Sequence, residues 1–379
     1  MNTITGLIAT FYRVLPYVHR ELLGLIPAVT WDPQAARAAI GQDVTIPTSP
    51  TVTAEDATPG TNPPDTGDVT YGTESMTIQK SRVVPFRWTG EEQRALRNGV
   101  GHMSLSEMAM FEAIRTLTNE MEADLAALYY RSHLAIGTVG TNPFATDVDI
   151  MADLQQLFDD MGVPRSGRNF VIDSTTATAG LKLDLLQQVH TSGSDDVLRR
   201  GVMGDLMNFD IRQSSAIKRH TAGTSASHQL NGAHAVGATT LNVDTGTGTI
   251  LPGDVLSIAN GTPADGYKYV VNSALTAGSL TIGKSGLRSA HADNDAVTRS
   301  ASYYALMAFH KSALRLATRL PSIPEEGDQA TDSEILTDPV TGLSFELRVY
   351  PQYRRVRYEI GAAWGVGNLH PAYSFIVQR

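Results

Sequence analysis

The pattern of apolar and polar positions changes twice along this chain and divides it into a host and an insertion. Residues 104–136 carry apolar side chains at steps of three and four, which predicts one long amphipathic helix. Residues 223–298 are instead rich in Gly, Thr, Ser, Ala and Asn, with only short apolar runs. Residues 303–320 return to an apolar pattern that we interpret as a helix. The pattern therefore predicts an α+β host chain interrupted by a β module.

The short apolar runs of the β module are bounded by Gly, Pro or Asn, and their spacing is typical of a small barrel or sandwich. They predict strands at residues 239–243, 254–258, 267–271, 279–282 and 296–299. In the host, the pattern predicts helices at residues 147–161 and 178–189. It also predicts host strands at residues 169–173, 344–350, 356–364 and 373–377, with irregular chain at residues 27–43 and 321–338.

The N-terminal stretch, residues 4–26, is apolar with a helical period. Arg13, Arg20 and Glu21 lie within it, so no uncharged run is long enough to cross a membrane. No basic segment precedes it, as one would in a secretory signal. We expect an amphipathic helix here and no contact with a membrane.

Residues 44–88 have the pattern of an extended, hairpin-like arm. Extended runs at residues 44–46 and 69–86 flank a segment in which five prolines exclude a helix. Between Ala38 and Gln79 there is no Lys or Arg, but there are six acids: Asp43, Glu55, Asp56, Asp65, Asp68 and Glu74. Such a segment is either a flexible acidic loop or an arm that reaches a basic neighbour.

Two capping boxes predict helix starts. Thr89 with Glu92 opens a short helix, and Ser104 with Glu107 opens the long one. About 33 residues at ~1.5 Å each would make the long helix about 50 Å in length. A coiled coil is the alternative for so long a helix, although the charge pairing that flanks a coiled-coil seam is weak here.

Composition narrows the function. The chain has 379 residues, 42% of them hydrophobic and 18% charged, which indicates a globular protein. Its net charge of −9 argues against a protein whose main task is to grip nucleic acid. It has no cysteine, so disulfides, Cys-ligated zinc and thiol catalysis are excluded.

Candidate chemical motifs lack the context that each would need. Residues 278–285 match a phosphate-binding P-loop string, but residues 279–282 themselves have the pattern of a strand and nothing helical follows. Asp147, Asp149 and Asp153 resemble the start of a calcium loop, yet Ala152 stands where that loop requires Gly. The ten histidines show no metal-ligand spacing. We therefore expect no catalytic, cofactor-binding or metal-binding residues.

One cluster of charge remains near the C-terminus, formed by Arg348, Arg354, Arg355 and Arg357. For an isolated chain, a solvated basic face explains it. In an assembly, this cluster could instead receive the acidic arm of another copy, because complementary charge fixes the register of an interface. As a hypothesis, these arginines and the six acids of the arm are subunit-interface residues, and reversing Arg354, Arg355 and Arg357 to Glu should block assembly.

The order of these elements resembles a known family, the major capsid proteins of tailed bacteriophages. Residues 77–88 look like the returning strand of that family's arm, residues 208–212 and 218–224 like the segment that enters an insertion, and residues 360–371 like its closing strand and turn. The resemblance is closest to the coat protein of short-tailed Salmonella phages, which carries an inserted β domain. The insertion here, near eighty residues, is shorter than in that coat protein.

The resemblance implies the capsid fold: an N-terminal arm, an extended loop, a long spine helix, and peripheral and apical domains, with a small all-β barrel-like domain inserted. The implied segments are residues 1–43 (N-terminal helical arm), 44–88 (extended loop), 89–145 (peripheral domain with spine helix), 146–222 (apical domain, first part), 223–299 (inserted β domain), 300–340 (apical domain, second part) and 341–379 (C-terminal strands of the peripheral domain).

The resemblance further implies self-assembly into pentamers and hexamers of an icosahedral shell, in the cytoplasm of a host bacterium and then in the virion. Implied partners are a scaffolding protein and a portal protein, and a decoration protein is one that the resemblance allows. Packaged DNA would be met only by non-specific proximity. Two alternatives stay open: another virion surface or glycan-binding protein, and a subunit of a protein-only cargo compartment.

Overall fold

The computed structural model describes residues 21–48, 69–97, 102–188, 199–262, 266–338 and 341–379, together with residues 52, 54 and 59. Most of the expected N-terminal helix lies outside this part of the chain. Of that segment the structure describes residues 21–26, and Ile26 begins the short 3₁₀ turn η2 (Ile26–Ala28). It then shows a strand, β1 (Thr30–Ala38), where we expected irregular chain within a helical arm.

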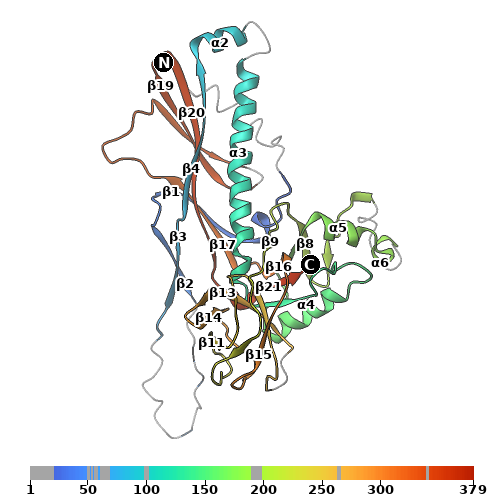
Figure 1. Cartoon of the computed structure of the whole chain (residues 1–379). Helices are drawn as coiled ribbons and strands as arrows, with labels where there is room; N and C mark the ends of the chain where they lie inside the picture. The colour runs from blue at the N-terminus through green and yellow to red at the C-terminus, as the bar shows by residue number, and fades with distance from the viewer. Residues whose placement is uncertain are drawn as a thin grey trace.

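A long, narrow sheet and one helix form the upper part of the molecule (Figure 1). The strands pair in the order β1, β17 (Leu314–Pro321), β20 (Arg355–Asn368), β19 (Ser344–Gln352) and β18 (Asp332–Thr337), and β4 (Lys80–Thr89) also pairs with β20. Helix α3 (His102–Ala127) packs along β4 and β20. We call this sheet and helix the tongue.

The apolar stripe that predicted the long helix is the face that α3 buries. Met110, Ile114, Leu117, Met121 and Leu125 are each at most 3% exposed and share one core with the strands of the tongue. The helix has 26 residues and is therefore about 39 Å long. The second capping-box prediction is wrong, because α3 already begins at His102, two residues before Ser104.

The body below the tongue is built on a second sheet. Its strands pair in the order β5 (Leu134–Ile136), β21 (Ser374–Gln378), β16 (Tyr303–His310), β6 (Arg168–Ile172), β8 (Phe209–Gln213) and β7 (Asp205–Leu206), and β9 (Arg219–His220) also pairs with β16. Three helices accompany it: α4 (Asp149–Asp160), α5 (Ser174–Leu181) and α6 (Asp184–Gln187). The predicted helix at residues 147–161 and strand at residues 169–173 are confirmed within two residues at each end.

The module at residues 223–299 is a closed β-barrel. Its strands pair in the order β12 (Val255–Ile258), β15 (Ala296–Arg299), β10 (His228–Leu230), β11 (Thr240–Asp244), β14 (Ser279–Ile282) and β13 (Lys268–Thr276), and β13 pairs back with β12. Each of the five predicted strand runs coincides with one of these strands, and β10 is additional. The barrel is continuous with the body because β13 also pairs with β5.

A two-stranded ribbon leaves the lower end of the tongue (Figure 1). It consists of β2 (Asp43–Thr48) and β3 (Gly72–Thr77), antiparallel, as the two extended runs predicted. Beyond β4, helix α2 (Gly90–Arg97) follows at the opposite end of the tongue. Its capping box is confirmed: Thr89 N donates to Glu92 Oε2 over 2.8 Å, and Glu92 N donates to Thr89 Oγ1 over 3.2 Å.

The expected helix at residues 303–320 is wrong. This segment forms two strands, β16 in the body and β17 in the tongue, joined by a turn. Nearly every residue of both strands is buried, so the run is apolar on both faces and its spacing does not separate helix from strand. The expected irregular segment at residues 321–338 likewise ends in strand β18.

Candidate subunit interface

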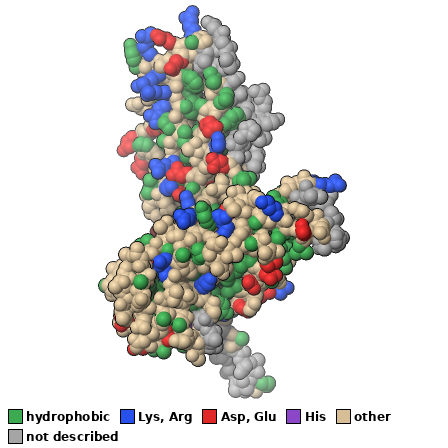
Figure 2. All heavy atoms as spheres, turned by 45° about the vertical axis from the view of Figure 1, so that its right-hand side comes forward, with side chains coloured by type: hydrophobic (Ala, Val, Ile, Leu, Met, Phe, Trp, Pro, Cys, Tyr) green, Lys and Arg blue, Asp and Glu red, His purple; other side chains and the backbone are tan. Residues whose placement is uncertain are grey.

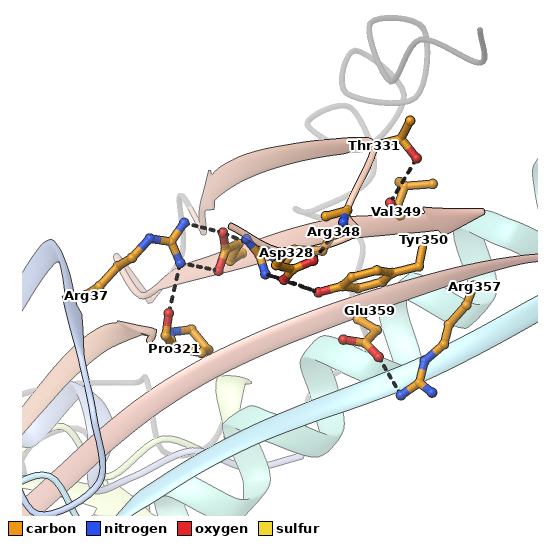
Figure 3. Close-up of polar contacts among 11 residues, drawn as sticks. Arg37, Pro321, Asp328, Thr331, Arg348, Val349, Tyr350, Arg357 and Glu359 are labelled. Atoms are coloured by element: carbon orange, nitrogen blue, oxygen red, sulfur yellow. Dashed lines mark hydrogen bonds and ion pairs between the residues drawn. The ribbon is translucent and has the colours of Figure 1, made fainter. Parts of the chain in front are cut away.

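Arg348, one of the four clustered arginines, is engaged inside the tongue rather than exposed for a partner (Figure 3). Its guanidinium pairs with Asp328 through Nη1 and with Glu346 through Nε at 3.2 Å, and Nη1 donates to the Tyr350 hydroxyl over 3.1 Å. Its side chain is only 12% exposed. Burial would lower the pKa of Arg348, but Glu346, Tyr350 and Asp328 together raise it.

The partner carboxylate shows why Arg348 has a structural role. Glu346 is 2% exposed and also accepts a bidentate pair from Arg37 of β1, at 3.0 Å from Nη1 and 2.6 Å from Nη2. Arg37 Nη1 donates in addition to the carbonyl of Pro321, at the end of β17, over 2.8 Å. Because a buried carboxylate needs this compensation, Arg348 and Arg37 hold β1, β17 and β19 together.

Arg357 also has an ion-pair partner within its own chain. It pairs with Glu359, two residues along β20 and on the same face of the strand (Figure 3). A change of sign at Arg357 would therefore place two carboxylates side by side within one strand. The four-arginine cluster thus divides into an internal pair, Arg348 and Arg357, and an outer pair, Arg354 and Arg355.

Arg354 and Arg355 lie at the far end of the tongue, in and after the tight turn between β19 and β20, where Gln352 pairs with Arg355. Both are exposed, and neither forms an ion pair with any residue that the structure describes. Tyr353, beside them, is 88% exposed. Figure 2 shows Lys and Arg side chains gathered towards this end of the molecule.

The turn at this end is strained and held in place. Arg354 has φ +56°, a left-handed conformation that usually favours Gly or Asn. Its carbonyl accepts a hydrogen bond from the amide of Gly90, at the start of α2, over 3.2 Å. A cleft with a volume of about 730 Å³ opens beside the turn, lined by Trp88, Glu91, Gln93 and the turn itself. We call this the tip cleft.

The structure describes two of the six acids of the arm, and both have partners in their own chain. Asp43 accepts a hydrogen bond from Thr77 Oγ1 over 2.7 Å. Glu74 pairs with Lys284 of the barrel at 3.5 Å. The four other acids, Glu55, Asp56, Asp65 and Asp68, lie outside the described residues. Neither Asp43 nor Glu74 contacts any of the four arginines within the described part of the chain.

Lys284 belongs to the P-loop-like string, whose geometry does not fit a phosphate site. Strand β14 occupies the middle of the string, and a turn rather than a helix follows it. The side chain of Lys284 is 71% exposed. Without a loop of inward-facing amides at a helix start, this segment has no cradle for a phosphate.

Sequence reasoning missed the tip cleft, although one signal was available. The predicted strands at residues 344–350 and 356–364 leave a very short interval, which predicts a tight turn that carries Tyr353 and two arginines. Exposed Tyr and Arg side chains are the types most enriched at binding hot spots. The position of Trp88 beside this turn could not be read from sequence, because it depends on β4 pairing with β20.

A buried carboxylate at the other end of α3 anchors the N-terminal segment. Glu122 is 1% exposed, and its Oε1 accepts hydrogen bonds from the amides of Gly24 and Leu25 and from Ser214 Oγ, each at 2.7 Å. Its Oε2 accepts from the amide of Ile26 over 2.8 Å. The Glu122 side chain therefore accepts hydrogen bonds from the amides at the start of η2. The first amides of a helical turn have no acceptor within the turn itself.

The joint between barrel and body is a buried polar cluster. His220 Nε2 lies 2.8 Å from Asp254 Oδ1, and its Nδ1 lies 2.9 Å from the Tyr129 hydroxyl. Nearby, the ring of His133 is fully buried, and neither of its nitrogens has a hydrogen-bond partner among the described residues. Burial, with a smaller contribution from Arg288, lowers the pKa of His133 to about 4.

Two further observations bear on function. Among the described residues, no group of three or more His, Asp or Glu side chains is placed to hold a metal ion. No helix in the described part of the chain has both the length and the apolar character needed to cross a membrane.

Comparison with known proteins gives matches in structure only. No protein-family model matches the chain, and no curated protein matches it. The chain is similar to the capsid structure of cyanophage P-SCSP1u, at 12% identity, over 94% of this chain and 88% of that chain, with a TM-score of 0.49. It is similar to the mature capsid of bacteriophage PhiM1, at 12% identity, over 93% and 85%, with a TM-score of 0.47.

A third match is a chain of Mycobacterium phage Che8, at 14% identity, over 96% of this chain and 90% of that chain, with a TM-score of 0.44. At identities and TM-scores this low, function has to be inferred from the geometry of this chain itself.

Proposed function

We propose that this chain is the major capsid protein of a tailed double-stranded DNA bacteriophage, which self-assembles into pentamers and hexamers of an icosahedral shell around the genome. Its role is structural rather than catalytic. Its proposed partners are other copies of itself, a scaffolding protein and a portal protein, with assembly in the cytoplasm of the host. The resemblance in element order noted from the sequence supports the same proposal.

The β2–β3 ribbon is the observation that carries the proposal. Within the described residues these strands pair only with each other, so both outer edges are free. The ribbon shares with the tongue only a small apolar cluster: Ala38, Met76, Ile78, Ala317 and Ala363. A lone two-stranded ribbon is marginally stable in water, and free edges invite pairing with another chain. Such a ribbon is stabilised when it lies on a neighbouring copy.

The tongue also exposes apolar side chains that a neighbouring copy could contact. Three of its strands carry an exposed large apolar residue: Trp31 on β1 is 37% exposed, Val83 on β4 is 47% exposed, and Ile335 on β18 is 42% exposed. They are scattered singly, so they offer separate points of apolar contact rather than a continuous patch. Helix α3 packs along β4 and β20 and stiffens the sheet.

Within this proposal, the outer arginine pair contacts the acidic arm of the next copy. Because Arg348 and Arg357 have internal partners, we assign the contact to Arg354 and Arg355. The acids that it would meet are those beyond the described residues: Glu55, Asp56, Asp65 and Asp68. Contacts of this head-to-tail kind are heterologous, and they form the rings that an icosahedral shell requires when the rotation between copies closes.

The experiment is electron microscopy and sedimentation of the purified chain and of one double variant, Arg354→Glu with Arg355→Glu. The wild type should form closed particles, and the variant should remain as folded, unassembled subunits. The matched control, Arg354→Lys with Arg355→Lys, keeps the charge and should still assemble. Normal particles from the glutamate variant would refute the charge contact, and wild-type chain that stays monomeric in all conditions would refute the proposed function.

A further inference from the structure

We propose that the tip cleft binds residues 62–68 of a second copy, the sequence Asn-Pro-Pro-Asp-Thr-Gly-Asp, by stacking on aromatic side chains and pairing with two arginines. This inference rests on the proposed function and names the occupant of one interface within it.

The cleft has the chemistry of a site for a proline-containing, acidic segment. Trp88 and Tyr353 line it together with Pro351, Arg354 and Arg355. Aromatic-lined grooves bind proline-rich segments, since proline rings pack on flat aromatic faces and lose little conformational freedom on binding. Its volume, about 730 Å³, is within the range of ~300–1,000 Å³ typical of ligand pockets.

The occupant is identified by complementarity within the chain itself. Residues 62–68 hold two consecutive prolines, Pro63 and Pro64, followed by Asp65 and Asp68. The surrounding segment contains no Lys or Arg between Ala38 and Gln79. Two carboxylates therefore match the two arginines that have no ion-pair partner among the described residues, and two prolines match the aromatic pair.

The turn beside the cleft has two unfavourable features, a strained backbone and an exposed aromatic ring, and a binding role explains both. Arg354 keeps a left-handed backbone where glycine would be unstrained, and Tyr353 leaves almost all of its ring in water. Strain of this kind collects at sites of function. The hydrogen bond from the Gly90 amide to the Arg354 carbonyl fixes the conformation of the turn. Little conformational entropy is therefore lost when the turn binds a partner.

Chain length excludes docking within one copy. Figure 1 shows β3 at the end of the tongue opposite to α2 and the tip. Strand β4 alone, ten residues long, spans about 33 Å between Lys80 and the tip, and β3 lies beyond Lys80. Pro64 is eight residues from Gly72 and can reach at most about 29 Å from it. The segment therefore meets a tip cleft only on another copy.

Glu91 should weaken binding of the segment, so replacing it should change the affinity in the opposite direction to replacing Tyr353. Glu91 lines the cleft and is exposed, so it repels the incoming carboxylates. Glu91→Gln should strengthen binding, whereas Tyr353→Ala should weaken it about tenfold, the effect of losing one aromatic anchor. Binding should also weaken with added salt, because both arginines are exposed.

The decisive experiment is a disulfide trap in assembled particles, and the absence of native cysteine makes it clean. Gln352→Cys, at a position that lines the cleft, and Thr66→Cys, within the docking segment, are placed in one full-length chain, assembled, and oxidised with diamide, so that the proposed aromatic and charged contacts are kept. We expect a ladder of covalently linked copies, because a disulfide forms only when the two Cα atoms come within about 7 Å. The control pairs Thr66→Cys with Val236→Cys on the barrel, where the native side chain is 61% exposed. An equal ladder in the control, or none in the test chain, overturns the inference.

A second measurement separates this inference from the proposed function. A labelled peptide of residues 60–69 is titrated against unassembled full-length chain by fluorescence anisotropy, with a scrambled peptide and Tyr304→Ala as controls. Loss of binding in Tyr353→Ala alone supports the tip cleft. Shells that form normally while the peptide fails to bind, or binds equally when scrambled, overturn the cleft but not the shell. Binding by a chain that never assembles overturns the shell but not the cleft.

Discussion

Replacing Glu122 with glutamine should detach the N-terminal segment from the long helix. The carboxylate of Glu122 accepts three backbone amides and one hydroxyl in a site that is 1% exposed. Glutamine keeps one oxygen, so the bonds to Oε1 become neutral. Its NH₂ group then faces the amide of Ile26, which leaves two donors opposed.

The expected cost follows from these bonds. Hydrogen bonds to a charged group contribute about 1.5–3 kcal/mol each, about twice the neutral value, and an unsatisfied buried donor costs about 1–3 kcal/mol. Because such terms are not additive, we expect Glu122→Gln to destabilise the fold by about 3 kcal/mol rather than by their sum. Glu112→Gln on the same helix is the matched control, since the Glu112 side chain is 68% exposed and pairs with Arg115 at the surface. It should cost under about 0.5 kcal/mol.

Urea denaturation measures the global effect, and hydrogen exchange with mass spectrometry measures the local one. Peptides that cover residues 21–28 should lose protection in Glu122→Gln but not in Glu112→Gln, because only the former removes acceptors from their amides. A Glu122→Gln chain with wild-type stability and unchanged exchange in this segment would refute the assigned role of the carboxylate.

Three further predictions concern the barrel and its joint. Folding lowers the pKa of His133 from its ordinary value of 6.5 to about 4, so the folded ring stays neutral as pH falls from 6.5 towards 4 while the unfolded chain gains a proton. The free energy of unfolding should therefore fall by about 3 kcal/mol over that window. In His133→Leu the urea midpoint should depend less on pH over the same window. If the pH profile of His133→Leu instead parallels that of the exposed-site control His370→Leu, the assigned role of His133 is contradicted. Gly253→Ala should cost about 3 kcal/mol, because Gly253 has φ +92° and a Cβ would lie 2.7 Å from the ring of Tyr129; an unchanged melting temperature would count against it. Lys284→Ala should change the free energy of unfolding by less than about 0.5 kcal/mol. Calorimetry should detect no ATP binding by the wild type. If the wild type binds ATP and Lys284→Ala does not, the P-loop interpretation is restored.

What the sequence could predict depended on whether a signal was local. The capping box at Thr89 and Glu92 is a local hydrogen-bonding pattern, and the structure contains it. Strands β11 and β14 of the barrel bury every second side chain and leave the others exposed or half-buried, so their period of two was visible. The segment 303–320 had no such alternation, because β16 and β17 are buried on both faces and are rich in Ala, Leu and Met.

The partners of the clustered arginines likewise could not be predicted from local sequence signals. A run of arginines is visible in the sequence, but whether each one has a partner depends on strand pairing. Arg348 meets Asp328, which precedes β18, because β18 pairs with β19, whereas Glu346 lies two residues away on the same face of β19. Strand β1 was missed for a related reason: its Pro33 and alanines give no strand pattern, and only parallel pairing with β17 makes it a strand.

The central claim is that copies of this chain interlock through the ribbon and the tongue. Cryo-electron microscopy of the purified, full-length chain under assembly conditions tests it most directly. The account predicts closed shells in which β2 and β3 of each subunit lie on the tongue of the next. Single subunits in every condition, with the ribbon folded back on its own body, would contradict it.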